Sequence, residues 1–385
     1  MLPEEERMYE LEKRKRRRAN LKISLHFAVG AALLVLLKIF LVNRETIPQW
    51  GPRLLALGGY LALWYLLSEF LYREWARTNY PDKLNPVKRF VDRFYKNKLA
   101  TFGLFLVLTI AMIAIFADDI AIYPYEYDAA WQEFSELPPA IEHPFGTLAS
   151  GEDLFSRVVY GARISLYLGV GVTLISSLIG LLMGVTAGYY GKTVDRSLHY
   201  INDVVMAFPF LVLVLVLVGA LRANESLNNA FALIAVVMGL DVRLTVAFFV
   251  LALVNWTALF RVVRSKVLSL RELGYVEAAR SCGAKPRTLI FRHLIPNSIP
   301  PVIIIATLAV GSVILTEAGL SYLGMGAELG TPSWGRLLSD AEGYVSQIRY
   351  FPLVFFPGLA ILLTVFGFTT MGDGLRDAID PRMKT

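Results

Sequence analysis

Long apolar stretches separated by polar and charged segments dominate this chain. A helix that crosses the hydrocarbon core of a bilayer needs roughly 20 apolar residues, and eight stretches approach or exceed that length. They cover residues 23–42, 54–72, 99–117, 164–189, 204–221, 244–260, 298–320 and 351–372. The pattern predicts an all-α polytopic membrane protein with eight spans.

The charges between these stretches predict the orientation of the spans. Residues 73–98 contain eight Lys or Arg against three acidic residues, and residues 261–293 contain eight against two. Residues 118–162 instead contain nine Asp or Glu and a single Arg. Because basic residues concentrate in cytoplasmic segments, we expect the first two segments in the cytoplasm and residues 118–162 outside.

Both chain ends fit this topology. The segment Met1–Lys22 contains six consecutive basic residues at 13–18 and no small-residue cleavage site after the first apolar stretch, so it reads as an uncleaved cytoplasmic start. Eight spans then return the basic segment 376–385 to the cytoplasm, and residues 321–350 form a second external loop.

Residues 222–243 do not fit a simple span. Their apolar part, 230–240, has only 11 residues, and Asp241 and Arg243 separate it from the next span. A segment this short cannot cross the bilayer alone. We expect either an external hairpin or a short interfacial helix.

Composition narrows the function classes. The mean hydropathy is +0.52, and 55% of the residues are hydrophobic against 18% charged, which argues against a soluble enzyme. The net charge of +6 sits in blocks beside the apolar stretches, so it reports membrane orientation, and we expect contact with lipid and none with nucleic acid. The single cysteine, Cys282, and four scattered histidines leave little for a metal site, and no cofactor is expected.

One span carries a regular stripe of small residues. Ser176, Gly180, Gly184 and Gly188 recur every four residues. This spacing lets two helix backbones approach closely. The stripe indicates helix packing, either within the chain or at a subunit interface.

The cytoplasmic loop 261–293 contains a further predicted helix. Residues Leu270–Cys282 are good helix formers with apolar positions at helical spacing, Gly283 suits a C-cap, and Pro286 suits the first turn of the next helix. The expected helix would be about 20 Å long at 1.5 Å per residue. Small residues at Ala278 and Ala279 would let another surface approach closely.

The spacing in this loop resembles a known motif. Glu277, Ala278 and Ala279 are followed by Gly283 and then by His293–Pro296. This arrangement is similar to the EAA motif of ABC-importer permeases, whose cytoplasmic coupling helix docks on an ATPase. The resemblance implies that Glu277, Ala278, Ala279 and Gly283 form the ATPase-coupling site.

Further stretches resemble the dipeptide, oligopeptide and nickel permeases, in particular the C-type subunit of the heterodimeric pair. The resemblance covers about 95–385, but Leu148 and Gly151–Asp153 depart from the usual pattern and residues 1–95 have no counterpart. The matching stretches are His143–Thr147, Ser156–Leu166, Glu317–Gly324, Thr331–Gly335, Pro357–Gly358 and Gly372–Arg382.

The resemblance implies a type I ABC-importer-like six-helix core at 96–385, preceded at 1–95 by a basic N-terminus and an accessory two-helix hairpin. It also implies partners: a second permease subunit in a heterodimer, two ATPase subunits that hydrolyse ATP, and an external substrate-binding protein. The chain itself is then a transport subunit in a prokaryotic cytoplasmic (inner) membrane and not an enzyme. Peptides, nickel chelates and oligosaccharides all fit as cargo.

Two carboxylates are candidates for the transport pathway. Glu317 lies in or near a span, where an ionisable residue indicates function unless it is capped or exposed at the outer end. Asp203 is expected to begin the span 204–221 beside Arg196 and His199, where it serves either as a helix cap or as a substrate contact.

Other readings are weaker or open. Gly188–Thr193 is similar to the end of a nucleotide-binding P-loop. The P-loop pattern requires a glycine at position 186, however, where this chain has Thr186, and the segment lies at the end of a span. Gly319–Ser321 suggests an intramembrane serine protease, yet no histidine lies in a later span to act as its base. An ATPase-independent channel or secondary transporter is the alternative function, and co-purification of an ATPase separates the two.

Overall fold

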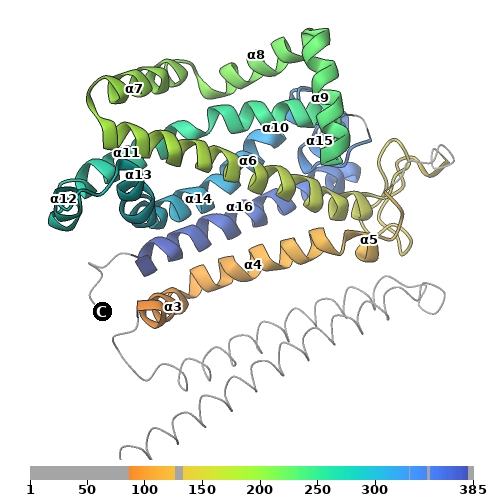
Figure 1. Cartoon of the computed structure of the whole chain (residues 1–385). Helices are drawn as coiled ribbons and strands as arrows, with labels where there is room; N and C mark the ends of the chain where they lie inside the picture. Colours follow the sequence, from red (N-terminus) through yellow and green to blue (C-terminus); the bar gives the residue numbers. More distant parts are fainter. Residues whose placement is uncertain (1–85, 126–132, 329, 345–346, 380–385) are drawn as a thin grey trace, which may run out of the picture.

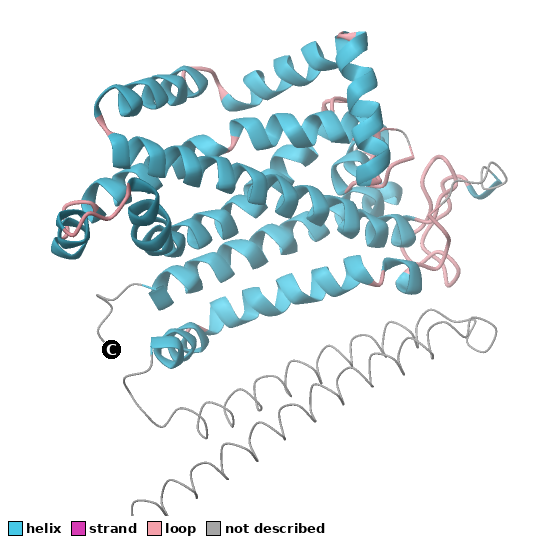
Figure 2. Cartoon of the chain, viewed as in Figure 1, coloured by secondary structure: helices cyan, strands magenta, loops and turns pink. Residues whose placement is uncertain are grey.

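The computed structural model describes residues 86–125, 133–328, 330–344 and 347–379, and these form a bundle of helices (Figures 1 and 2). The spans expected at 23–42 and 54–72 lie outside the described residues. Within the described ranges, β structure amounts to one isolated antiparallel bridge, Thr147 to Asp153. The longer helices are α3 Pro86–Lys96, α4 Lys98–Ile115, α6 Leu154–Tyr190, α7 Lys192–Met206, α8 Phe210–Ala223, α9 Glu225–Met238, α10 Val242–Val254, α11 Trp256–Leu270, α12 Gly274–Ser281, α14 Ile295–Tyr322 and α16 Phe351–Ile379, and the short ones are α5 Ala117–Ile120, α13 Pro286–Leu289 and α15 Trp334–Asp340.

Five helical runs are long and apolar enough to cross a membrane. A sixth crossing results if α7 and α8, which are bent by 90° at a short break, form one broken span. The expectation of an all-α polytopic membrane protein is confirmed, and the described residues supply five or six of the eight expected spans. The five runs are Lys98–Ile115, Leu154–Tyr190, Val242–Leu270, Pro286–Tyr322 and Ile348–Ile379.

The expectation of one continuous helix at 204–221 is wrong. The chain bends between α7 and α8, where Pro209 lacks an amide proton and disfavours helical geometry at Phe208. Because α7 already begins at Lys192, Asp203 lies near the C-terminal end of that helix and does not cap a helix start. The acidic residue in the first turn of α7 is Asp195.

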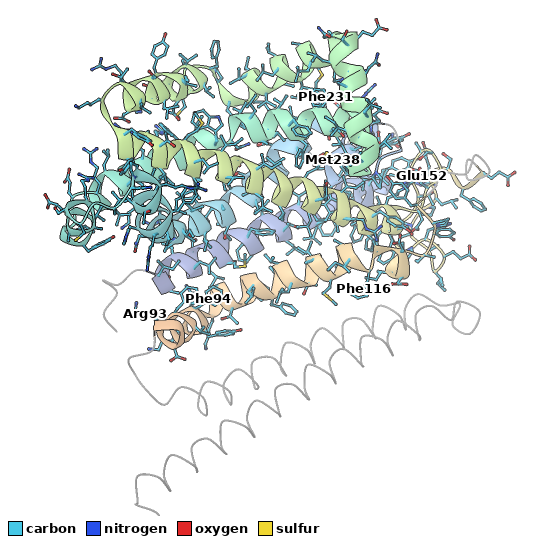
Figure 3. All side chains as sticks on the ribbon, in the orientation of Figure 1. Arg93, Phe94, Phe116, Glu152, Phe231 and Met238 are labelled. Atoms are coloured by element: carbon cyan, nitrogen blue, oxygen red, sulfur yellow. The ribbon has the colours of Figure 1, made fainter. Side chains whose placement is uncertain are left out.

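Within residues 222–243, where the sequence left an external hairpin or a short interfacial helix open, the chain forms the short helix α9, Glu225–Met238. Asn224 caps its start by accepting a hydrogen bond from the Leu227 amide at 3.1 Å, and Gly239 ends it with a φ of +66°. Figure 1 shows α9 running across the ends of α8 and α10. Its Phe231 and Met238, labelled in Figure 3, pack against the apolar cluster beneath.

The segments of opposite charge lie at opposite ends of the bundle. Helices α3, α12 and α13 and the end of α16 gather at one end, which we call the α12 end (Figure 1). Helices α5 and α15 and residues 133–153 gather at the other, the α15 end. The segments expected in the cytoplasm are therefore separated from those expected outside by the length of the long helices.

Helix α6 forms the centre of the bundle and packs against α4, α10, α11 and α14. Its stripe of Gly180, Gly184 and Gly188 faces α11, and a Cβ atom at any of the three would come within 3.0 Å of an α11 atom. At Gly184 that Cβ would lie 2.8 Å from the Val263 Cβ and 2.9 Å from the Phe260 carbonyl oxygen. The stripe thus permits a backbone-to-backbone approach inside this chain.

Filling this contact is expected to destabilise the bundle. Gly184→Ala should lower the free energy of unfolding by about 1–3 kcal/mol, because the added methyl group overpacks the α6–α11 contact. Thermal unfolding of the purified full chain in detergent measures the effect. Gly319→Ala in α14 is the matched control, since no neighbouring atom lies within 4 Å of a Cβ there; equal stability of the two variants would contradict the packing argument.

Candidate functional site

The α12 end presents a short helix that stands away from the bundle (Figure 1). Among its residues, Val276 is fully buried and anchors the helix. Leu273 and Tyr275 each keep 45% of their surface exposed, and Glu277 and Ala278 are exposed as well. A helix with one buried anchor and an exposed apolar and charged face offers a surface for another protein.

The expected helix at Leu270–Cys282 is shorter in the structure. Helix α11 ends at Leu270, Leu273 is extended, and α12 covers only Gly274–Ser281. Leu270 is buried as part of the α11 core, so the chain must leave that helix before α12 can begin. Eight residues correspond to a helix of about 12 Å.

The turn behind α12 has the expected geometry. Gly283 has a φ of +81°, a conformation that glycine adopts without strain. Its amide donates to the Arg280 carbonyl at 3.0 Å, and the Ala284 amide donates to the Ala279 carbonyl at 3.1 Å. Pro286 then occupies the first turn of α13. This turn fixes the direction in which α12 projects.

A cleft of about 530 Å³ separates α12 from the end of α6. Arg271 bridges the two by donating to the Gly188 carbonyl at 3.2 Å. About two turns earlier, Arg264 of α11 makes a bidentate ion pair with Asp195 of α7, with 2.6 Å between Nη2 and Oδ2. These contacts tie the base of α12 to the ends of α6 and α7. The cleft is lined by Tyr189, Tyr190, Arg271, Glu272, Glu277 and Arg280.

At the α15 end, Asp153 caps α6. Its Oδ2 accepts hydrogen bonds from the Ser156 amide at 2.8 Å and the Ser156 hydroxyl at 2.7 Å, while its Oδ1 lies 3.1 Å from Nδ1 of His143. Burial raises the pKa of the Asp153 carboxyl, and these hydrogen bonds oppose that shift. The cap explains why α6 begins at Leu154, ten residues before the predicted span.

A buried arginine joins three segments in the same region. Arg157 forms a buried ion pair with Glu152 and donates hydrogen bonds to the carbonyls of Tyr125 and Gly330, both at 3.2 Å.

Nearby, the pKa of the Glu136 carboxyl is lowered because it accepts hydrogen bonds from two tyrosine hydroxyls. The donors are Tyr350 at 2.7 Å and Tyr344 at 2.8 Å.

Helix α15 docks on α6 and α14 through two glycines. The buried Trp334 donates from Nε1 to the Val158 carbonyl at 2.9 Å, and a Cβ at Gly161 would lie 2.5 Å from the Trp334 ring. Likewise, a Cβ at Gly335 would lie 2.3 Å from the Cα of Ala318. The stretches at 143–147, 156–166, 317–324 and 331–335 thus meet in one rigid assembly.

Glu317 is part of this assembly. The side chain is fully buried, and its Oε1 accepts a hydrogen bond from the Ser321 hydroxyl at 2.7 Å. The Ser321 oxygen in turn accepts from the Ala327 amide at 3.1 Å. Glu317 therefore holds the turn that follows α14, whereas Asp203 is exposed on α7 with His199 at 3.6 Å. The structure does not bring these two carboxylates together.

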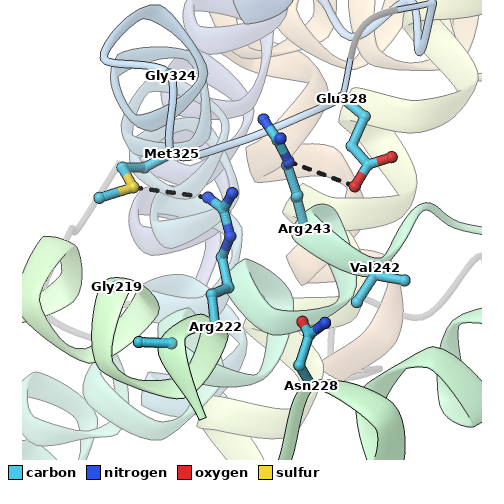
Figure 4. A pocket seen from close by; sticks show the side chains of 9 residues that line it. Gly219, Arg222, Asn228, Val242, Arg243, Gly324, Met325 and Glu328 are labelled. Carbon is cyan, nitrogen blue, oxygen red and sulfur yellow. Dashed lines mark hydrogen bonds and ion pairs between the residues drawn. The ribbon is translucent and has the colours of Figure 1, made fainter. Parts of the chain in front are cut away.

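The turn after α14 covers a pocket of about 540 Å³ that the sequence analysis missed (Figure 4). Arg222 of α8 and Arg243 of α10 both point toward this turn. Arg243 pairs with Glu328 at 3.3 Å, and Arg222 contacts the Met325 sulfur at 3.6 Å. Charges beside the apolar segment 230–240 were the available signal, but nothing in the sequence links them to residue 328.

In the part of the chain that the structure describes, no group of three or more His, Cys, Asp or Glu side chains could hold a metal ion.

Two known families match this chain. The family described as binding-protein-dependent transport system inner membrane component matches residues 177–385. The N-terminal transmembrane domain of oligopeptide transport permease C matches residues 85–139. The matches therefore include α12, the turn after α14 and the pocket beneath it.

Individual relatives agree with the family matches. The dipeptide transport system permease protein DppC of Alkalihalophilus pseudofirmus is 40% identical over 78% of this chain and 92% of its own length. The glutathione transport system permease protein GsiD of Pectobacterium atrosepticum is 36% identical over 78% and 92%. Among solved structures, the inward-facing MetNI methionine ABC transporter aligns with 59% of this chain and 98% of its own, with a TM-score of 0.45 and 18% identity. On the family and relative matches, this chain belongs to the binding-protein-dependent transport system inner membrane components and is an ABC-importer permease of the C type.

Proposed function

We propose that this chain is one half of a heterodimeric permease that imports peptides or related small solutes. Relatives with at least 36% identity are named as dipeptide and glutathione transport permeases, which supports small peptides as cargo. An external substrate-binding protein delivers the solute, and two ATPase subunits in the cytoplasm hydrolyse ATP. The permease lies in a prokaryotic cytoplasmic membrane with both termini inside.

The observation that carries this proposal is the exposed surface of α12. Glu277, Ala278 and Ala279 lie on a helix that packs mainly against α13 and projects from the end of the bundle. The small side chains of Ala278 and Ala279 allow close approach of an ATPase surface, and Glu277 adds a charge that selects its orientation. Gly283 fixes the turn that aims this helix.

The contacts at the base of α12 provide a path for mechanical coupling. Movement of α12 is transmitted through Arg271 to the end of α6 and through α11 and the Arg264–Asp195 pair to α7. ATP-driven closure of the ATPases then shifts these helices as rigid elements and changes the side of the membrane to which the pathway opens. An ATPase-independent channel or secondary transporter would not require the projecting helix.

Substitutions in α12 are expected to uncouple transport. Glu277→Lys reverses the contact charge, and Gly283→Leu forces a branched side chain into a positive φ, which costs about 1–2 kcal/mol. Both should reduce ATP-dependent uptake in proteoliposomes by about tenfold or more while the permease still inserts and assembles.

Two variants serve as controls for the coupling prediction. Gly283→Asn should retain most of the uptake, because asparagine tolerates the left-handed conformation better than other residues. Glu342→Lys makes the same charge change at the α15 end and should leave uptake unchanged. Wild-type uptake by both Glu277→Lys and Gly283→Leu would remove the assignment of α12 as the docking helix.

The proposed orientation is tested by labelling single cysteines in a Cys282→Ser background. A cysteine at Tyr275 should react with a membrane-impermeant thiol reagent only after the membrane is opened. A cysteine at Glu342 should react in intact cells. Labelling of position 275 from outside intact cells would invert the proposed topology.

We further propose that the accessory hairpin expected at residues 1–95 ends before residue 85 and lies outside the transport pathway. The family matches begin at residue 85. The contacts of α3, on which Figure 3 labels Phe94, support a boundary there, because Phe94 packs with Ala100 and Ala378 and Asn97 donates to Asp377 at 3.2 Å. Helix α3 is thus fastened to the end of α16 and belongs with the core.

Deleting residues 1–84 should leave assembly and ATP-dependent uptake within about twofold of the full-length chain. The remaining Arg93, Lys96 and Lys98 still supply basic residues that hold the start of α4 in the cytoplasm. Uptake by the truncated complex in proteoliposomes measures this. Deletion through residue 96 is the comparison, and it should impair stability because it removes Phe94. A truncated complex that assembles fully but does not transport would place the hairpin in the transport cycle.

A further inference from the structure

The pocket under the turn after α14 contains one guanidinium, that of Arg222, which forms no ion pair with a carboxylate of the described residues. Of the two acidic side chains nearby, Glu328 pairs with Arg243, and Asp241 accepts the amides of Leu244 at 2.7 Å and Glu328 at 3.3 Å. Among the described residues, the guanidinium of Arg222 makes one hydrogen bond, to the Met325 sulfur, while the charges of Glu328 and Asp241 act on it without an ion pair. A thioether is a weak acceptor, so most of the five N–H donors of Arg222 remain available to a ligand.

Other groups around Arg222 favour an anion of limited charge. Asn228, which lines the pocket, comes from the first turns of α9, and the N-terminus of that helix adds a partial positive charge (Figure 4). The carboxylates of Asp241 and Glu328 disfavour a dianion such as phosphate. A planar carboxylate with a single negative charge can instead accept two hydrogen bonds from a guanidinium fork.

The size and place of the pocket fit the end of a peptide. A volume of about 540 Å³ is within the range of small-ligand sites. The pocket opens at the α15 end, which the proposed topology places on the side where the solute arrives. Its wall includes Gly219 and Gly324, so backbone as well as side chains can approach the ligand.

We infer that Arg222, assisted by Asn228, binds the C-terminal carboxylate of the arriving peptide before translocation. This inference rests on the proposed import function and adds a binding subsite to it. Glu317 acts here as a positioning residue, because through Ser321 and the Ala327 amide it holds the turn that carries Met325 and Glu328 over the pocket.

The site is tested by protection of a cysteine against labelling. Val242→Cys in a Cys282→Ser background places a single thiol in the pocket wall. In the full chain in lipid nanodiscs, saturating trialanine should slow the reaction of this thiol with a neutral reagent at least threefold. Trialanine amide should not slow it. Adding Arg222→Gln should weaken protection by trialanine about tenfold, the effect of losing one charge-assisted hydrogen bond.

Matched variants keep this result interpretable. Arg222→Lys should retain part of the protection, and Arg349→Gln, which removes an arginine at the same end but outside the pocket, should retain all of it. A labelling rate of the Arg222→Gln variant equal to that of its parent without peptide shows that the pocket is intact. Equal protection by trialanine and its amide, unchanged protection in Arg222→Gln, or protection by acetate or phosphate alone at the same concentration would each overturn the proposal.

The labelling experiment needs neither an ATPase nor a binding protein. A negative result therefore removes the carboxylate site and leaves the import proposal standing. Failure of ATP-dependent uptake in the wild-type complex would remove the import proposal instead.

Discussion

The close contact between α6 and α11 is the constraint on which the other features depend. Three glycines at four-residue spacing place no side chain on this face of α6, so side chains and carbonyl oxygens of α11 lie directly against the α6 backbone along several turns. In a bilayer, where apolar side chains gain little by leaving lipid, such close packing is a main source of helix association. The path of α11 then determines where α12 emerges.

The length of α6 connects the two ends of the protein. Its 37 residues correspond to about 55 Å, which exceeds the roughly 30 Å hydrocarbon core. The N-terminal end of α6 is capped by Asp153 and packs against Trp334 of α15. The other end receives the hydrogen bond from Arg271 at the base of α12. The proposed displacement of α12 thus acts on an element that also carries the assembly at the α15 end.

The buried polar residues of the α15 end hold the surrounding segments in place through hydrogen bonds and ion pairs. Arg157, Asp153 and Glu317 are each buried. Arg157 joins segments distant in the sequence through its hydrogen bond to the Gly330 carbonyl, whereas Asp153 and Glu317 accept local hydrogen bonds from Ser156 and Ser321. Breaking such an arrangement leaves an uncompensated buried group, which is costly. The result is a frame of joined segments at the α15 end. Arg222, at the end of α8, differs because its charge is directed into a pocket.

Much of this structure followed from the sequence. Length and apolarity identified five helices that are long and apolar enough to cross a membrane, and charge blocks identified which segments share an end. Gly283 and Pro286 marked a turn because their backbone preferences are local. The glycine stripe likewise predicted a close contact between two helices. The spacing alone did not identify α11 as the partner, because it carries no information about the opposing surface.

Other features were decided by tertiary structure. Helix α7 begins at Lys192, directly after Gly191, so Asp203 lies near the C-terminal end of that helix and not at a helix start. The burial of Leu270 in the α11 core shortened the helix expected at Leu270–Cys282. The pocket around Arg222 required α8, α10 and the turn after α14 to meet, although the chain separates Arg222 from Met325 by 103 residues. Sequence patterns report preferences over a few helical turns, whereas the partner of a charge or a glycine depends on which distant segments pack together.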